Sequence, residues 1–191
     1  FLFVCIKGFT SDGHNFIDEA IKKGAVVLVV EEEIPPRPGI TIIKVDDTRK
    51  ALAILANQFY GFPSRKLKLI GVTGTNGKTT ITYMLRAILQ GAGYKTGLLG
   101  TAQNIIANDI NSSHMTTMES IDLQKTLKEM VKQKTDYVVM EASSHALQLS
   151  RVEGCDFDVA IFTNISKEHF EIHKNFSNYL EAKKKLFLNL N

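Results

Sequence analysis

Short apolar runs alternate with amphipathic stretches along this chain. In its first third, the runs at residues 2–6, 25–30 and 40–45 are typical of buried strands. The spacing of apolar positions predicts helices over residues 16–23 and 48–59. Because strands that are separated by helices pair in parallel and are covered on both faces, this pattern predicts an α/β fold.

The same alternation continues after a break at residues 61–66, where Gly, Pro, Ser and basic residues gather as in a linker. Beyond the break, the expected strands are at 69–72, 137–140 and 158–162, and the expected helices are at 83–89, 120–132 and 176–189. We therefore expect two domains, a small α/β domain at 1–64 and a parallel-sheet domain at 65–191.

The second domain opens with a pattern that is typical of phosphate binding. A strand-like run leads into Gly74-Thr75-Asn76-Gly77-Lys78-Thr79-Thr80, and a helical pattern follows. Glycines let the backbone approach an anion, and the N–H groups at the helix start face it. Lys78 is expected to reach the β- and γ-phosphates, and the Thr79 hydroxyl to bind Mg²⁺, as in a P-loop ATPase domain. The strict motif has Gly where this chain has Val72, so an ordinary strand-to-helix turn is the alternative.

Three more positions carry candidate chemistry. Glu141 ends a predicted strand, where a carboxylate beside the phosphate loop can bind Mg²⁺; capping of the next helix is the alternative. His169 also follows a strand and is either a metal ligand or a solvent-facing residue at a helix start. Lys183 lies in a run of three lysines, and such a run on a helix is ordinarily a solvated face.

Composition narrows the class of protein only mildly. With 44% apolar and 23% charged residues, the 191-residue chain has the balance of a soluble globular protein. A formal net charge of +3, mostly dispersed, does not indicate nucleic-acid binding. Cys5 and Cys155 lack metal-site spacing, which fits a reducing compartment, and neither a membrane-spanning run nor a signal peptide is evident. We expect a monomeric cytoplasmic protein without membrane or nucleic-acid partners.

Both ends of the chain fall on expected core elements. Phe1 directly precedes a strand-like run, and Asn191 follows an amphipathic helix. Domains rarely begin or end on core elements. We therefore expect a fragment, incomplete at the start of its first domain and truncated at the end of its second.

Four ordered motifs resemble the signature of the Mur ligases. They are residues 73–80, 140–147 (Met-Glu-Ala-Ser-Ser-His-Ala-Leu), 162–169 (Phe-Thr-Asn-Ile-Ser-Lys-Glu-His) and 179–187 (Tyr-Leu-Glu-Ala-Lys-Lys-Lys-Leu-Phe). Residues 2–8 with 12–13, and residues 116–124, resemble more narrowly the members of the MurE type, which add the third amino acid to the peptidoglycan precursor. The likeness extends over essentially the whole chain, and four motifs in order are far more specific than a phosphate loop alone.

The resemblance implies an ATP-dependent carboxylate–amine ligase of bacterial cell-wall synthesis that uses two Mg²⁺ ions. In this family, ATP activates a substrate carboxylate as an acyl phosphate, and an amine then attacks it to give an amide. The matching catalytic positions are Lys78, Glu141, His169 and Lys183. Thr79 and Glu141 are the implied ligands of one ion, whereas His169 and a CO₂-derived carbamate on Lys183 help to hold the second.

The acceptor that the resemblance implies is UDP-MurNAc-L-Ala-D-Glu. Its matching positions are Thr116, Thr117, Ser143 and Arg151. Hydroxyl groups and a guanidinium suit phosphates, sugar hydroxyls and a glutamyl carboxylate. The uridine end is expected in the first domain, at Thr10 and Ser11. A surface salt bridge is the alternative role for Arg151.

Other functions stay open at this point. Folylpolyglutamate synthase shares the chemistry, but residues 116–117 and the N-terminal pattern argue against it. A regulatory P-loop NTPase would leave residues 143–145 and Lys183 unexplained. A non-catalytic module that binds nucleotide or precursor is the third alternative. Since the family has a further C-terminal domain that takes the incoming amino acid, diaminopimelate or lysine, we expect this chain by itself not to complete ligation.

Overall fold

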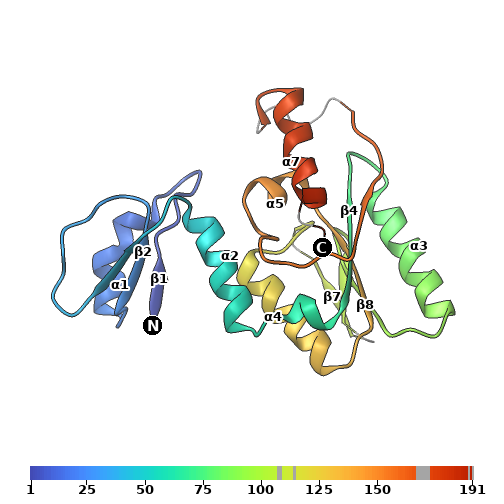
Figure 1. Cartoon of the computed structure of the whole chain (residues 1–191), viewed down its shortest axis with the longest axis horizontal. Helices are drawn as coiled ribbons and strands as arrows, with labels where there is room; N and C mark the ends of the chain where they lie inside the picture. Colours follow the sequence, from blue (N-terminus) through green and yellow to red (C-terminus); the bar gives the residue numbers. More distant parts are fainter. Residues whose placement is uncertain (107–108, 114, 167–172, 189, 191) are drawn as a thin grey trace. The chain divides into compact units, whose positions relative to one another are not determined.

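The computed structural model describes residues 1–106, 109–113, 115–166, 173–188 and 190. The chain divides into two compact units, Phe1–Leu52 and Ala53–Asn191 (Figure 1). Each unit has its own sheet and its own core. Among the described residues, no helix is long and apolar enough to cross a membrane.

The first unit contains a three-stranded parallel sheet in the order β1-β2-β3. Its strands are β1 (Leu2–Val4), β2 (Val27–Val30) and β3 (Thr41–Lys44), each shorter than the apolar run that predicted it. A 3₁₀ turn, η1 (Gly13–Phe16), leads into helix α1 (Ile17–Lys22). Ile17 and Ala20 of α1 are buried in one cluster with Leu28 of β2, so the apolar face of the helix packs on the sheet.

The second unit contains a six-stranded sheet in the order β7-β6-β5-β8-β4-β9. Its strands are β4 (Lys68–Thr73), β5 (Thr96–Leu99), β6 (Gln103–Ile106), β7 (Asp109–Ser112), β8 (Tyr137–Glu141) and β9 (Val159–Phe162). Strands β5, β8, β4 and β9 pair in parallel, which confirms the expected α/β fold class. Strands β6 and β7 pair antiparallel, and the apolar pattern did not predict this hairpin.

Helices cover both faces of this second sheet. They are α3 (Lys78–Gly91), α4 (Ser120–Lys132), α5 (Ser144–Gln148) and α7 (Phe176–Leu188). One core joins Leu69 of β4 with Leu127 of α4 and Leu186 of α7. The next residue of β4, Ile70, packs with Leu85 of α3 in a second core. Because successive side chains of a strand point to opposite faces, α3 and α4 lie on opposite sides of the sheet (Figure 1).

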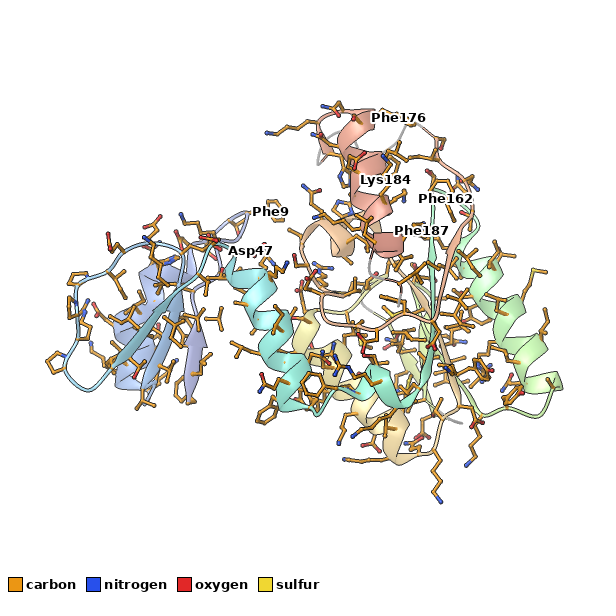
Figure 2. The ribbon with its side chains drawn as sticks, in the orientation of Figure 1. Phe9, Asp47, Phe162, Phe176, Lys184 and Phe187 are labelled. Carbon is orange, nitrogen blue, oxygen red and sulfur yellow. The ribbon has the colours of Figure 1, made fainter. Side chains whose placement is uncertain are left out.

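Helix α7 is tied to the edge strand β9 and buries one stripe of side chains. The rings of Phe162 in β9 and Phe187 in α7 meet edge-on, with centroids 6.4 Å apart (Figure 2). The buried residues of α7 are Tyr179, Ala182, Lys183 and Leu186. Their spacing of three, four and seven defines one helix face. Lys183 is therefore buried beside exposed lysines, and its interpretation as part of a solvated face is wrong.

The division between the two units falls inside helix α2 (Thr48–Phe59), whereas we expected the boundary between residues 64 and 65. Within the second unit, Asn57 Nδ2 of α2 donates to Gly154 O at 2.6 Å. The 3₁₀ turn η2 (Pro63–Lys66) follows, and its first two residues are buried. The breaker-rich segment thus packs on the second unit and is not a free linker.

Candidate functional site

The predicted phosphate loop connects β4 to α3, and its backbone suits anion binding. Gly74 and Gly77 have φ angles of 147° and 85°, which residues with side chains rarely adopt. A Cβ atom on Gly74 would lie 1.9 Å from Thr163 Oγ1. Gly77 is the N-cap residue of α3 and has no side chain, so no side chain caps the first N–H groups of that helix. These N–H groups can face an anion.

A segment that follows β9 braces the phosphate loop. The backbone N–H of Thr75 donates to Asn164 O at 2.9 Å, and that of Asn76 donates to Asn164 Oδ1 at 3.0 Å. In return, Asn76 O accepts from Thr163 Oγ1 at 2.6 Å and from Asn164 Nδ2 at 3.1 Å. The loop conformation therefore depends on residues far along the chain.

Two lysines meet at the start of the loop. Lys78 Nζ donates to Gly74 O at 3.0 Å and to Thr75 O at 2.8 Å. Lys183 Nζ, which is buried, donates to the same Gly74 oxygen at 2.8 Å. It also lies 4.4 Å from the centroid of the Tyr179 ring, within cation–π range. Two amino groups that donate to one carbonyl oxygen make the start of the phosphate loop favourable for binding an anion.

Tyr179 connects helix α7 to the phosphate loop. Its side chain is buried, and its hydroxyl lies 3.0 Å from Thr75 Oγ1. The same Thr75 oxygen accepts from the backbone N–H of Ser166 at 2.9 Å. The sequence reading did not single out Tyr179, although its place on the buried stripe of α7 is visible in the apolar spacing.

Glu141 ends β8 with a buried carboxylate that faces the start of α3. Its Oε1 accepts from Thr79 Oγ1 at 3.0 Å and from Thr101 N at 2.9 Å, and its Oε2 accepts from Thr101 Oγ1 at 3.1 Å. Ser143 caps helix α5 instead, since its Oγ accepts from Ala146 N at 3.2 Å. The helix-cap alternative for Glu141 is therefore wrong. A carboxylate within hydrogen-bond reach of a threonine hydroxyl is a donor set that suits Mg²⁺.

The residues that are predicted to bind the acceptor substrate gather around the main chain of Glu141. Thr117 Oγ1 donates to Glu141 O at 2.8 Å and accepts from Ser143 N at 3.1 Å. Thr116 Oγ1 lies 3.0 Å from Thr101 Oγ1 and can donate to it, since the Thr101 hydroxyl itself donates to the Glu141 carboxylate. Long-range folding thus brings together hydroxyls that lie far apart in the chain.

Arg151 completes this group of residues. Its Nη1 donates to Thr117 O at 3.2 Å, and its Nη2 forms an ion pair with Glu119 Oε1 at 2.6 Å. The salt bridge that the alternative interpretation predicts therefore exists. The Arg151 side chain is only 17% exposed, however, so its guanidinium is held against residues 117 and 119 and is not a free surface group.

Three predicted site residues belong to other parts of the chain. Thr10 and Ser11 are exposed residues of the first unit, in a turn that Gly8 N closes by donating to Ser11 O at 2.8 Å. His169 lies outside the described residues. Within the described ranges, no group of three or more His, Cys, Asp or Glu side chains forms a metal cluster.

Sequence reasoning missed two further contributors. Thr101 binds the Glu141 carboxylate through both its backbone N–H and its hydroxyl, and Asn164 braces the phosphate loop. Thr101 follows a four-residue strand that the apolar pattern did not reveal. Asn164 lies inside a quoted motif, but only the folded chain brings its side chain to Asn76.

Two family profiles match the chain. The profile described as Mur ligase middle domain matches residues 72–191, and the profile described as Mur ligase family, catalytic domain, matches residues 1–60. Together they span both compact units.

Several curated relatives are similar to this chain at high identity. The chain is 53% identical over 188 residues to UDP-N-acetylmuramoyl-L-alanyl-D-glutamate–2,6-diaminopimelate ligase 1 of Clostridium acetobutylicum, with 98% of the chain matched. It is also 53% identical over 191 residues to the corresponding ligase of Clostridium botulinum. The chain spans about 39% and 40% of the lengths of these two relatives.

Several solved structures are also similar to this chain. A structure of UDP-N-acetylmuramoyl-L-alanyl-D-glutamate–2,6-diaminopimelate ligase superposes with a TM-score of 0.84 at 28% identity, over 100% of this chain and 39% of that one. MurF ligase from Thermotoga maritima in complex with ADP is similar in fold, with a TM-score of 0.55 at 24% identity over 97% of this chain and 39% of that one. FolC from E. coli in complex with DHPP and ADP, at 20% identity and a TM-score of 0.56, shares the fold over 75% of this chain and 40% of its own.

Proposed function

This chain belongs to the Mur ligase family, and from that premise we propose that it carries the nucleotide-binding and acceptor-binding parts of a bacterial peptidoglycan ligase. The complete enzyme would join the third amino acid to UDP-MurNAc-L-Ala-D-Glu at the expense of ATP, in the cytoplasm. The names of the relatives favour 2,6-diaminopimelate over lysine as that amino acid.

One observation carries this proposal. Glu141 contacts the phosphate loop through its carboxylate, by way of Thr79, and contacts the acceptor residues through its main-chain oxygen, by way of Thr117. A single residue at a strand end therefore joins the two groups. A ligase that phosphorylates a carboxylate needs the γ-phosphate of ATP and the acceptor carboxylate side by side, and this juxtaposition supports that requirement.

ATP fits the loop from Gly74 to Thr80. The positive φ angles of the two glycines and the uncapped start of α3 suit a polyphosphate. The Lys78 ammonium would stabilise charge on the β- and γ-phosphates. Lys78 donates to two loop carbonyls, so its side chain already points back over the loop.

The reaction that follows has two steps. The D-glutamyl carboxylate of the acceptor attacks the γ-phosphorus of ATP, the bond to the bridging oxygen breaks, and an acyl phosphate and ADP form. The amine of the incoming amino acid then attacks the acyl carbon, loses a proton, and expels phosphate to leave an amide. Thr116, Thr117, Ser143 and Arg151 would orient the acceptor for the first step, and Thr10 and Ser11 would bind its uridine end.

The donor set around Glu141 fits Mg²⁺. Thr79 and Glu141 would hold one ion, and His169 with a carbamylated Lys183 would help to hold a second. When bound, the ions would offset the repulsion between the γ-phosphate and the attacking carboxylate. Thr101 orients the Glu141 carboxylate by donating to both of its oxygens.

The surroundings of Lys183 support its carbamylation. The amino group is buried and shares the Gly74 oxygen with Lys78, so conversion to an anion would relieve the repulsion between two cations. A carbamate nitrogen keeps one N–H, which can still donate to Gly74 O.

Calorimetry with UDP-MurNAc-L-Ala-D-Glu tests the proposed function. We expect saturable binding by the chain, strong loss of binding in Arg151→Ala, and no loss in Arg65→Ala. Arg65 is a suitable control because it is an exposed arginine of the same unit that pairs with Asp156. A chain that binds Mg-ATP but not this precursor would contradict the proposal and favour another carboxylate–amine ligase or a bare NTPase.

The second candidate function is binding without ligation. The chain spans about 39% of the length of the Clostridium acetobutylicum ligase to which it is similar. We expect the 191-residue chain to bind ATP and precursor but not to form the amide. Turnover by this chain alone, measured as ADP release that requires both precursor and diaminopimelate, would contradict that expectation.

A further inference from the structure

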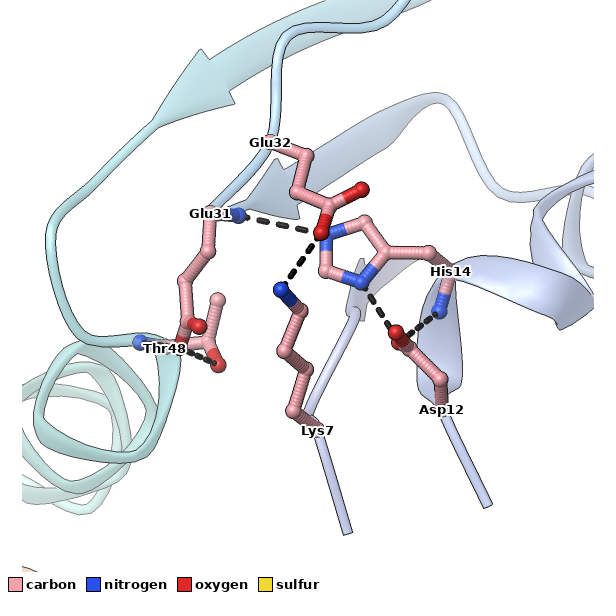
Figure 3. Close-up of polar contacts among 6 residues, drawn as sticks. All are labelled: Lys7, Asp12, His14, Glu31, Glu32 and Thr48. Carbon is pink, nitrogen blue, oxygen red and sulfur yellow. Dashed lines mark hydrogen bonds and ion pairs between the residues drawn. The ribbon is translucent and has the colours of Figure 1, made fainter.

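A polar network occupies the carboxyl edge of the sheet in the first unit. Its members follow β1, follow β2 and begin α2, and Figure 3 shows them: Lys7, Asp12, His14, Glu31, Glu32 and Thr48. Lys7 Nζ pairs with Glu32 at the exposed side of the network. The remaining four residues form a continuous path of hydrogen bonds.

The path begins at the base of a tight turn. Gly13 N donates to Ile6 O at 2.8 Å, Lys7 and Asp12 form an antiparallel bridge, and Gly8 N donates to Ser11 O at 2.8 Å. Phe9 lies at the tip of this turn and is 81% exposed (Figure 2). The turn therefore presents residues 9–11 to solvent while its two ends are fixed.

His14 fixes the base of the turn through hydrogen bonds at both of its ring nitrogens. Asp12 Oδ1 accepts from the backbone N–H of His14 at 2.9 Å and from its Nδ1 at 2.6 Å (Figure 3). Nε2 accepts from the backbone N–H of Glu31 at 3.2 Å. These partners require the tautomer that carries its proton on Nδ1. The two hydrogen bonds from His14 also hold the pKa of the Asp12 carboxyl below its usual range, so this acceptor is ionised at neutral pH.

Glu31 continues the path to helix α2. Its Oε1 accepts from the backbone N–H of Thr48 at 2.8 Å and from the Thr48 hydroxyl at 2.6 Å. Thr48 is fully buried. The imidazole of His14 is only 9% exposed, so the path is shielded from solvent at its centre.

We infer that His14 is a positioning residue that fixes the turn at residues 8–11 in the shape that receives the uridine end of the precursor. The inference rests on the proposed function, because that function gives Thr10 and Ser11 their ligand. His14 itself does not need to touch the ligand. It connects the turn to the end of β2, and through Glu31 to α2, so that the turn is rigid before the ligand arrives.

Two variants of the 191-residue chain separate the two hydrogen bonds of the His14 ring, and a third variant is the control. His14→Asn keeps an N–H close to the place of Nδ1 but offers no acceptor to Glu31 N. His14→Gln extends an amide oxygen towards Glu31 N but removes the donor to Asp12. Asn15→Ala is the matched control, because Asn15 is the exposed neighbour of His14 on the same 3₁₀ turn.

Two readouts are needed, namely hydrogen–deuterium exchange of the amides of residues 8–13 and calorimetry with UDP-MurNAc-L-Ala-D-Glu. In both His14 variants, we expect amide exchange in the turn to accelerate and the precursor Kd to rise, each by about tenfold. The affinity for Mg-ATP should not change, because that site belongs to the second unit. Asn15→Ala should behave like the parent chain in every measurement.

Parent-like exchange rates in both His14 variants would overturn the inference, and so would faster exchange with an unchanged precursor Kd. Thermal unfolding of each variant identifies a global loss of structure, which would accelerate exchange in β2 as well as in the turn. If the parent chain does not bind the precursor, the proposed function fails. The exchange rates of residues 8–13 then decide by themselves whether His14 fixes the turn.

Discussion

Lys78 and Lys183 donate to one and the same oxygen, the carbonyl of Gly74, at 3.0 and 2.8 Å. Lys78 begins α3, whereas Lys183 reaches the oxygen from the buried face of α7. Two ammonium groups held so close repel each other unless an anion lies nearby or one of them loses its charge. Phosphate bound at Lys78 and carbamylation of Lys183 would each provide such relief, and they lead to separate predictions.

Carbamylation of Lys183 should be visible by carbon NMR. In buffer with ¹³C-labelled bicarbonate at mildly alkaline pH, the chain should show a carbamate resonance that Lys183→Met lacks. Lys184→Met is the control, because Lys184 is an exposed neighbour on the same helix and should keep the signal. A signal that survives Lys183→Met, or no signal in the parent chain, would contradict the assignment.

Glu141→Gln should weaken Mg-ATP binding far more than metal-free ATP binding. The variant keeps an oxygen that can accept from Thr79 and Thr101, but it removes the charge that would hold Mg²⁺. We expect the affinity for Mg-ATP to fall by about 10- to 100-fold. Titrations with Mg²⁺ and with a chelator measure the difference. Glu129→Gln, on the exposed side of α4, should leave both affinities unchanged. Equal losses with and without Mg²⁺ would argue against a metal role for Glu141.

Tyr179→Phe should loosen the phosphate loop without disturbing the core. It removes the hydroxyl that contacts Thr75 but keeps the ring beside Lys183. We expect the free energy of unfolding to fall by about 1 kcal/mol, because a buried Thr75 oxygen loses one partner. Urea denaturation measures this loss, and ADP titration should show weaker binding. Tyr94→Phe, at a tyrosine that is 45% exposed, should change neither quantity.

Gly74→Ala should be strongly disruptive. The new Cβ would lie 1.9 Å from Thr163 Oγ1. Alanine would also have to adopt the φ angle of 147° that Gly74 has, which residues with side chains rarely adopt. We expect a loss of about 2 kcal/mol or more in stability, together with loss of ATP binding. Gly91→Ala is the matched control, since a Cβ at the end of α3 meets no atom within 4 Å. A Gly74→Ala chain of normal stability would mean that the loop can shift away from Thr163.

Neither cysteine should react readily with alkylating reagents in the folded chain. Burial raises the pKa of the Cys5 thiol to about 11 and that of Cys155 to about 12. Since the thiolate is the reactive form, the higher pKa lowers the reactive fraction at pH 8 by roughly 100-fold for Cys5 and by roughly 1,000-fold for Cys155. Mass spectrometry after iodoacetamide treatment, with and without urea, checks this. Rapid modification of the native chain would show that one of these sites opens.

The local parts of the second unit were predictable from the sequence. The strand, phosphate loop and helix around Gly74 and Lys78 are encoded within one short stretch, and α4 has the bounds that its apolar spacing predicts. The hairpin of β6 and β7 was not predictable in the same way. Its strands have four residues each, and all four positions of β7 are exposed, so no alternating burial marks them.

The roles of individual site residues depended on contacts across the chain. Lys183 illustrates this, because three consecutive lysines are usually solvated and only the spacing with Tyr179 and Leu186 turns one of them inward. Thr101 gave no local signal at all, since its function is defined by a carboxylate forty positions away. The functional roles of all the candidate site residues, Thr10, Ser11 and His169 included, stay predictions.

Glu141 contacts the phosphate loop and the predicted acceptor-binding residues through chemically different groups. The carboxylate serves the phosphate loop, whereas the main-chain oxygen serves Thr117. Every amino acid supplies that main-chain oxygen, so a substitution at position 141 can remove the proposed metal ligand and still leave the hydrogen bond to Thr117 in place. In the proposed site, a substitution at position 141 can therefore remove the carboxylate contact but not the main-chain contact. An enzyme engineer could therefore exchange the proposed metal ligand at this position and keep the backbone contact that holds the proposed precursor site.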